Sequence, residues 1–371
     1  MRFPEFTEEW EEHALAEYLD FKNGLNPDVK RIGRGLPFIS VMDILADGTI
    51  NYDSIRGKVE ATEREIENFS VEKGDILFQR SLETLEDVGR ANVYMDNRTA
   101  VYGGFVIRGR KIGDYNPLFF KYLLSTPLAR KRTCRMGAGA QHFNIGQDGL
   151  SKISLCFPLM EEQNKIARLL SLIDERIVTQ NKIIDKLQSL IKGLRVCCMQ
   201  RNGSDNVYLS EIAQIYQPQT ISSAELTEDG FLVYGANGII GKYKDYNHKT
   251  EQICITCRGN TCGMVNYTKP MSWITGNAMV INTDKYQDKV YKKYLYHYLS
   301  AYNFNSIISG SGQPQIVRTP LEKLKITLPT ISEQKQKAMI LDKIQDKIEI
   351  NHNVLNLYIL QKQYLLRQMF I

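Results

Sequence analysis

The sequence has no apolar run that approaches the roughly 18 to 20 residues of a membrane-spanning helix. Its first residues, MRFPEFTEEWEEH, are acidic and contain no apolar signal core, so we expect neither export nor a membrane partner. Cysteine is sparse, with 7 in 371 residues at irregular places. This usage indicates reduced thiols in a cytoplasmic protein rather than a disulfide framework.

Motifs that carry catalysis are also missing. No GxxxxGK[ST] stretch is present to cradle a triphosphate. Cys254-x-x-Cys257 with Cys262 offers three thiols, but no second CxxC accompanies them and the pair lies in a strand-like run, so we expect no zinc site. The 5 histidines are scattered without a nearby acid or nucleophile. The sequence therefore argues against an enzyme and predicts neither a metal nor a cofactor of its own.

The excess of basic over acidic residues is small. The net charge is +5, from 47 basic and 42 acidic residues, which does not by itself call for nucleic acid. The stretch 121–135, KYLLSTPLARKRTCR, nevertheless holds five basic residues and no acid. Such a cluster suits the neutralisation of phosphates, although a solvated loop explains it almost as well.

What the chain does have is a repeat. Residues 157–200 begin FPLMEEQNKIARLLSLIDERI, and residues 328–371 begin LPTISEQKQKAMILDKIQDKI. The two stretches align without a gap, and each has a proline followed by Glu-Gln near its start. A period this long exceeds that of solenoid repeats, which is roughly 20 to 50 residues. The chain is therefore predicted to consist of two similar halves.

Both copies of the repeat carry an apolar seam with alternating steps of three and four residues. This spacing predicts two long helices that need a partner, and we expect them to form one antiparallel coiled coil, with the central amides Gln180 and Asn351 fixing its register. The alternative is two amphipathic helices that each pack on a globular neighbour. The central seam positions are Leu170, Ile173, Ile177, Gln180 and Ile184, and Leu341, Ile344, Ile348, Asn351 and Leu355.

The remaining sequence predicts one mixed globular domain ahead of each helix, giving an α+β fold with approximate two-fold symmetry. The expected boundaries are 1–157 for the first domain, 158–204 for its helix and linker, 205–328 for the second domain and 329–371 for the second helix. Within the first domain we expect a helical opening at 7–20, short strands from 36 to 112 and a helix at about 116–131. The second domain is expected to repeat this order, with a short helical opening at VYLSEIAQIY.

The order of these features resembles the specificity subunit of type I restriction-modification systems over the whole length. The resemblance is carried by RFPEFTEEWEE, by GDILFQRS at 74–81, by GSGQPQI at 310–316 and by the two helices that begin with Pro and Glu-Gln. It implies two target recognition domains, which read the halves of a split site on double-stranded DNA. It also implies docking of two modification subunits, which bind S-adenosylmethionine and methylate adenine, and of restriction subunits that use ATP. The specificity subunit itself does no chemistry. From the residues alone, the other reading is a protein-interaction scaffold with two similar binding domains.

Candidate DNA contacts follow from the resemblance and from the usual chemistry of base reading, in which Arg and Lys bind guanine and Asn and Gln bind adenine. A structural role in a loop is about as well supported for each, because most protein contacts to DNA go to phosphate and sugar. Gln252-Ile253-Cys254-Ile255 is aligned here with Gly74-Asp75-Ile76-Leu77. The expected base readers are Gln79, Arg80, Gln141 and His142 in the first half and Arg258, Asn260, Gln313 and Gln315 in the second, and the expected phosphate contacts are Arg130, Lys131 and Arg132.

Overall fold

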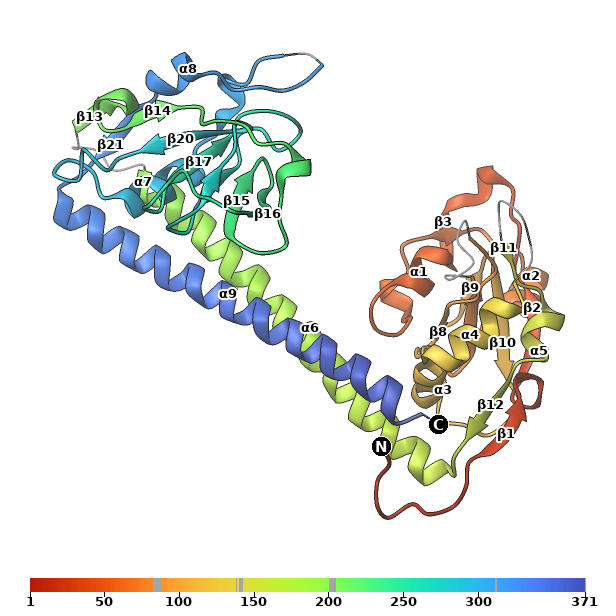
Figure 1. The fold of residues 1–371 in the computed structure, drawn as a ribbon. Helices are drawn as coiled ribbons and strands as arrows, with labels where there is room; N and C mark the ends of the chain where they lie inside the picture. Colours follow the sequence, from red (N-terminus) through yellow and green to blue (C-terminus); the bar gives the residue numbers. More distant parts are fainter. Residues whose placement is uncertain (83–87, 138, 140–142, 200–204, 311, 371) are drawn as a thin grey trace. The chain divides into compact units, whose positions relative to one another are not determined.

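The computed structural model describes residues 1–82, 88–137, 139, 143–199, 205–310 and 312–370 (Figure 1). It divides into two compact units, Met1–Asn181 with Val354–Ile371, and Lys182–Asn353. Each unit combines a mixed domain with parts of the two long helices, α6 (Met160–Met199) and α9 (Ile331–Gln368). Within the described ranges, no helix has both the length and the apolar character to cross a lipid bilayer.

The first unit is built on an antiparallel sheet of order β2-β10-β6-β8, which is flanked by a second sheet of order β4-β3-β9-β5. Strand β1 pairs with β12 beside the start of α6, and β7 pairs with β11. The strands are β1 (Glu11–Ala14), β2 (Leu19–Asn23), β3 (Ile32–Ile39), β4 (Lys58–Val59), β5 (Ser70–Val71), β6 (Ile76–Gln79), β7 (Ser81–Leu82), β8 (Ala91–Val93), β9 (Ala100–Tyr102), β10 (Val106–Lys111), β11 (Phe143–Asn144) and β12 (Ser154–Phe157).

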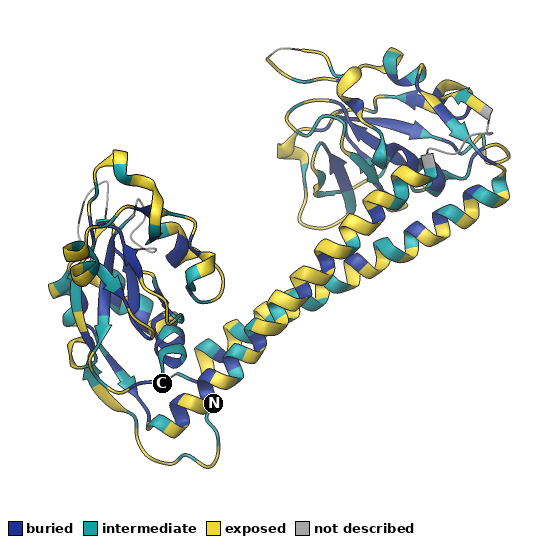
Figure 2. Cartoon of the chain, turned by 180° about the vertical axis from the view of Figure 1, so that it is seen from behind, coloured by how far each residue is buried: buried dark blue, intermediate teal, exposed yellow. Residues whose placement is uncertain are grey.

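The helices of this unit contribute to two apolar cores, whose buried residues are dark blue in Figure 2. Phe119 and Phe120 of α3 are fully buried in the core on the first sheet, whereas Phe69 of α2 packs against the other core, which includes residues of the second sheet. Asn116 caps α3 by accepting hydrogen bonds from the backbone N–H groups of Leu118 and Phe119, with Pro117 at the first helical position. The helices are α1 (Val41–Leu45), α2 (Glu63–Phe69), α3 (Pro117–Leu124), α4 (Pro127–Arg135) and α5 (Gln147–Ser151).

The second unit repeats this plan with a sheet of order β14-β20-β17-β18 and a smaller sheet of order β16-β15-β19. Strand β13 pairs with β21 just ahead of α9, as β1 does with β12 ahead of α6. Its elements are β13 (Asp205–Tyr208), β14 (Gln214–Tyr216), β15 (Phe231–Gly235), β16 (Gly238–Tyr243), β17 (Ile253–Thr256), β18 (Val265–Tyr267), β19 (Trp273–Ile274), β20 (Ala278–Asn282), α7 (Lys292–Ala301), α8 (Arg318–Glu322) and β21 (Lys325–Leu328).

The repeated Glu-Gln of the long helices has a structural explanation. In the first unit, buried Gln163 accepts a hydrogen bond from the Asn116 N–H at 3.0 Å and donates to the Pro158 carbonyl at 3.0 Å. In the second unit, buried Gln334 accepts from the Tyr291 N–H at 2.8 Å and donates to the Pro329 carbonyl at 2.9 Å. This glutamine clamp fastens the start of α3 or α7 to the long helix that follows the domain.

The two long helices pack against each other inside each unit, and they do so antiparallel. In the first unit, Lys362 of α9 pairs with Asp174 of α6 at 2.6 Å, and Tyr358 accepts a hydrogen bond from Arg176 at 3.2 Å. In the second unit, Ile191 clusters with Leu341 and Ile348. Each of the ten predicted seam residues is buried or half-buried. Gln180 belongs to the first unit and Asn351 to the second, and their pairing stays a prediction.

Four local predictions are wrong. Both segments that were expected to open their domain as a helix form a strand, a short 3-10 turn and a second strand. The reason is that β1 pairs with β12 and β13 pairs with β21, and such tertiary pairing overrides helix propensity. The expected helix at 116–131 is two helices, because Thr126 caps a new helix whose first residue is Pro127. Residues 41–45, expected as strand, form α1.

Candidate nucleic-acid interface

In the second unit, the structure gathers the predicted base readers at one edge. The segment that follows β17 pairs with the segment ahead of α8, through a bridge between Arg258 and Gln315 and a 3.0 Å hydrogen bond from the Gly259 N–H to the Pro314 carbonyl. Gln315 also exchanges two backbone hydrogen bonds with Ser309, which closes a tight loop. The side chains of Arg258, Asn260, Gln313 and Gln315 are all exposed. We call this surface the second reading edge.

A hollow of about 340 Å³ lies beside Arg258 and Gln315. Its lining adds Gln217 and Arg318, and Arg318 forms an ion pair with Glu322 at 2.7 Å. Cys257 also lines the hollow, and burial raises the pKa of its thiol, which keeps it neutral near pH 7. The hollow therefore offers amide and guanidinium donors over an uncharged floor.

The first unit forms a comparable edge around Arg80, which follows β6. The Arg80 carbonyl accepts a hydrogen bond from the Ile145 N–H at 3.0 Å, and the next residues, in β7, pair with β11. The Arg80 side chain is half-buried, and its Nη1 donates to the Gly104 carbonyl at 3.4 Å. Gln141 and His142 lie outside the residues that the structure describes. We call the described part of this surface the first reading edge.

Gln79 does not belong to this edge. It is the last residue of β6, its side chain has no exposed surface, and its Nε2 donates to the Ser81 carbonyl at 3.4 Å. A side chain enclosed in this way has no access to a base, so the prediction that Gln79 reads DNA is wrong for the domain as it is folded.

Equivalent hydrogen bonds define how the two domains align. The Asp75 carbonyl accepts from the Tyr94 N–H at 3.0 Å, and the Gln252 carbonyl accepts from the Thr268 N–H at 2.8 Å. The Ile316 N–H donates to the Cys257 carbonyl, as the Ile145 N–H does to that of Arg80. Gln252 therefore matches Asp75 and not Gly74, so the sequence alignment was one residue out. Arg258 consequently matches Ser81, and Arg80 matches Cys257.

The predicted phosphate contacts divide into two kinds. Arg130 donates to the Val88 carbonyl at 2.6 Å, and Arg132 pairs with Glu12 at 2.6 Å and also donates to the Ser154 carbonyl. Lys131 and Arg135 of the same helix are exposed. Arg130 and Arg132 thus tie α4 to the domain, whereas Lys131 and Arg135 are presented to solvent.

Sequence reasoning missed one position, the residue immediately ahead of the central strand. Phe105 precedes β10 with 69% of its surface exposed, and Asn277 precedes β20 and is exposed as well. Their carbonyls accept hydrogen bonds from the N–H groups of Arg80 and Cys257, so both residues border the reading edges. The available signal was the glycine that immediately precedes each residue, Gly104 in GGFVIRG and Gly276 in TGNAMVIN.

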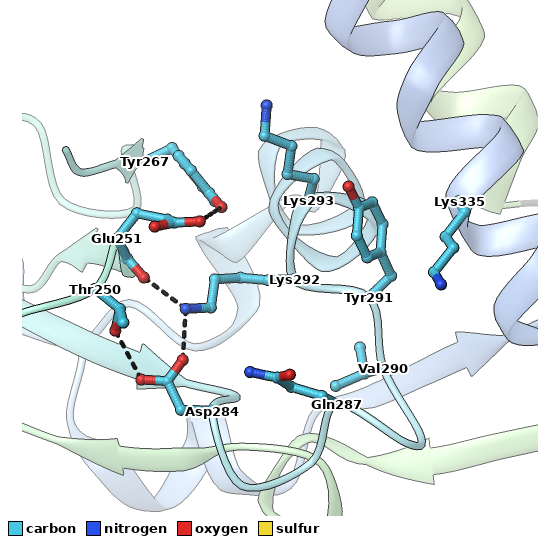
Figure 3. A pocket seen from close by; sticks show the side chains of 10 residues that line it. All are labelled: Thr250, Glu251, Tyr267, Asp284, Gln287, Val290, Tyr291, Lys292, Lys293 and Lys335. Atoms are coloured by element: carbon cyan, nitrogen blue, oxygen red, sulfur yellow. Dashed lines mark hydrogen bonds and ion pairs between the residues drawn. The ribbon is translucent and has the colours of Figure 1, made fainter. Parts of the chain in front are cut away.

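A second hollow, of about 360 Å³, lies at the start of α7 (Figure 3). Lys292 is its central cation, and it donates to the Asp284 carboxylate at 2.6 Å and to the Glu251 carbonyl at 2.6 Å. Burial raises the pKa of Asp284, but hydrogen bonds from Lys292, Gln252 and Thr250 outweigh it and lower that pKa overall. These paired charges connect the end of β20 to α7, which is a structural role.

The three thiols considered for zinc are Cys254, Cys257 and Cys262. Cys254 is fully buried in β17, and burial raises its pKa to about 12. Across the described residues, the structure contains no group of three or more His, Cys, Asp or Glu side chains placed to hold a metal ion.

The chain thus has two mixed domains with equivalent backbone hydrogen bonds. Each domain is fastened to a long helix by a glutamine clamp and presents a different polar edge. These features define a duplicated two-domain binding protein. A model of the type I restriction modification DNA specificity domain matches residues 7–189 and 202–357, and the chain belongs to this family.

Individual relatives agree with this assignment. The chain is 25% identical over 388 residues to a putative type I restriction enzyme specificity subunit, MjaX, of Methanocaldococcus jannaschii, covering 93% of this chain and 89% of the relative. It is 32% identical over 140 residues to the EcoprrI specificity subunit of Escherichia coli, covering 36% and 34%. The fold is similar to the crystal structure of a type I S subunit from M. genitalium, with a TM-score of 0.68, 16% identity, and 98% and 96% of the two chains covered.

Proposed function

We propose that this chain is the non-catalytic, DNA-reading subunit of a type I restriction-modification complex and that it recognises a split site on double-stranded DNA. Residues 1–157 and 205–328 are the two target recognition domains, and 158–204 and 329–371 are the spacer helices. The observation that carries the proposal is the duplicated pattern of backbone hydrogen bonds. Equivalent bonds hold Arg80 in the first domain and Cys257, next to Arg258, in the second, but the side chains exposed beside them differ.

Different side chains on one frame suit two readers of different half-sites. The second reading edge presents a guanidinium and three amides, which are the groups that bind guanine and adenine in the major groove. We assign base contacts to Arg80, Arg258, Asn260, Gln313 and Gln315. Gln141 and His142 remain candidates on the strength of the resemblance. Lys131 is assigned to a phosphate, because it is exposed on α4, which Arg130 and Arg132 anchor to the domain.

We further propose that α6 and α9 dock the modification subunits. Both helices expose large apolar side chains outside their seams, among them Leu190 at 49%, Ile340 at 57% and Leu357 at 64%. Contiguous apolar patches mark contacts for other proteins, and we propose that these side chains contribute to such a contact with the modification subunits. S-adenosylmethionine and ATP are then bound by partner subunits, and restriction subunits join the same assembly. A scaffold without DNA recognition would use the same helix surfaces, but it would not need two diverged polar edges.

The test is genome-wide adenine methylation, read by long-read sequencing, in a host that carries this chain with its cognate modification subunit. The control host carries the modification subunit alone. We expect a split methylation motif that depends on this chain, and we expect exchange of 205–328 for another recognition domain to change only one half of it. If the modification subunit is active but no motif depends on this chain, the scaffold function is favoured instead.

A further inference from the structure

The turn ahead of the central strand is built in the same way in both domains. In the first, the Val106 N–H donates to the Gly103 carbonyl at 2.9 Å, and the Arg80 N–H donates to the Phe105 carbonyl at 2.9 Å. In the second, the Ala278 N–H donates to the Thr275 carbonyl and the Cys257 N–H to the Asn277 carbonyl, both at 3.0 Å. The backbone of Phe105 and of Asn277 is therefore fixed from two sides.

The glycine inside each turn has close neighbours. A Cβ on Gly104 would meet the end of the exposed Asn26 side chain, which is free to rotate aside. A Cβ on Gly276 would lie 2.3 Å from Oγ1 of Thr220 and 3.0 Å from the Pro218 carbonyl oxygen, so the packing is firmer in the second domain. The glycine carbonyls are also engaged, by Arg80 Nη1 in the first domain and by Gln217 Nε2 in the second. Each turn is thus pressed onto its domain, and the residue after the glycine is the one that it presents.

The presented side chain differs between the domains, although its surroundings are similar. Phe105 borders Arg80, and Asn277 borders the segment of Cys257 and Arg258, so both lie next to the proposed base readers. One domain has a phenyl ring at this position and the other has an amide. Rigid backbone with a variable exposed side chain is the arrangement that a specificity determinant needs.

We propose that Phe105 and Asn277 are specificity-determining base contacts, one in each half-site. Asn277 binds the adenine edge with its amide, and Phe105 packs on the methyl group of a thymine, both in the major groove. This inference rests on the proposed function, because it assumes that the two edges read DNA.

The experiment uses the chain with its cognate modification subunit and reads the methylation motif by long-read sequencing. Asn277→Ala is expected to lower discrimination at one base position of one half-site by roughly 5- to 150-fold, as for loss of a bidentate amide contact. Phe105→Ala is expected to relax one position of the other half-site. Asn277→Asp, which keeps the size of the side chain but replaces the amide donor by an acceptor, is expected to lose the preference for adenine at the same position, and this excludes a packing defect.

The matched controls lie at the opposite ends of the same strands. Ile112 follows β10 and is 61% exposed, and Gln287 lies beyond β20 and is exposed. Ile112→Ala and Gln287→Ala are expected to leave the motif unchanged. If the wild-type chain directs a split motif and the variants at Phe105 and Asn277 direct the same one with equal discrimination, this inference is wrong while the proposed function stands. If the wild-type chain directs no motif, both are wrong.

Discussion

The two domains differ in the buried polar residue at the start of one sheet strand. In the first, buried Asp75 accepts hydrogen bonds from the Glu72 and Lys111 N–H groups, at 2.8 and 3.2 Å, and lies 3.2 Å from Nε of Arg110. In the second, the matching residue is neutral Gln252, which donates to Asp284 at 2.9 Å. The strand pairing is nevertheless the same. The strand pairing therefore does not require one particular buried polar residue, and each domain provides hydrogen-bond partners for its buried polar groups in a different way.

The largest expected effect comes from Asp75→Asn. An amide keeps one acceptor oxygen, for the Glu72 N–H, and turns its NH₂ group toward the Lys111 N–H, which is also a donor. Leaving that donor unsatisfied, at about 1–3 kcal/mol, and losing the charge that faces Arg110 are together expected to destabilise the first unit by about 4 kcal/mol. The 2 tryptophans make this measurable, because Trp10 lies in the first unit and Trp273 in the second. In a Trp273→Phe background, urea unfolding followed by fluorescence reports on the first unit.

Asp114→Asn is the control for this change, since Asp114 is 88% exposed and only loosely paired with Lys111, at 3.8 Å. A similar loss of stability from both variants would show that Asp75 has no special role. In a Trp10→Phe background, Asp75→Asn is expected to leave the unfolding of the second unit unchanged.

The glutamine clamps provide the second prediction, because they are equivalent in the two units. Gln163→Leu and Gln334→Leu each remove an acceptor from a backbone N–H and a donor from a carbonyl. We expect each to destabilise its own unit by about 2–3 kcal/mol. Gln361→Leu and Gln188→Leu, at exposed positions of the same two helices, are the controls. A clamp variant no less stable than its control would mean that the clamp does not fasten the domain to the helix.

These clamps also show how much of the structure could be predicted from the sequence. The repeat predicted both long helices and the duplicated domains, because helix periodicity and motif order are local signals. The repeat could not assign the role of Gln163, since its partner Asn116 lies 47 residues away in the sequence and becomes a neighbour only in the fold. The burial of Gln79 and the strand at 11–14 escaped prediction for the same reason, because pairing with distant strands decided both. Residue type was enough to nominate the exposed residues around Arg258 as candidate base readers, whereas it could not nominate Phe105, because an apolar residue gives no such signal.

A third prediction concerns acid sensitivity, which should differ between the units. Six residues after the clamped position, α3 has Tyr122, which donates to Asp174 at 2.8 Å, whereas α7 has His297, which is 3.0 Å from Asp342. Burial lowers the pKa of His297, and Arg195 lowers it further against the opposing effect of Asp342. Burial and Asp174 raise the pKa of Tyr122, so it stays neutral.

Because His297 is neutral in the fold and protonates more readily in the unfolded chain, the unfolded state binds more protons as the pH falls below about 6.5. The second unit is therefore expected to lose stability between about pH 6.5 and 5, and His297→Gln should reduce this loss. Thermal unfolding at several pH values, followed through Trp273 in a Trp10→Phe background, measures it. His248, whose pKa burial also lowers, is in the same unit, so part of the dependence should remain. An unchanged pH dependence in His297→Gln would assign all of it to other groups.

The smallest expected effect concerns the difference in basic residues between the two units. Helix α4 of the first unit has four basic residues, of which Lys131 and Arg135 are exposed, whereas the segment after α7 in the second unit, YNFNSII at 302–308, has no charged residue. Lys131→Ala should therefore weaken DNA binding by the assembled complex without changing its preferred site. The slope of log affinity against log salt concentration should become shallower by about 0.9, the value for one phosphate contact. Lys73→Ala, at an exposed position near the opposite end of β6 from Arg80, should leave the slope unchanged. A changed preferred sequence in Lys131→Ala would make Lys131 a base reader, and an unchanged slope would remove it from the DNA surface.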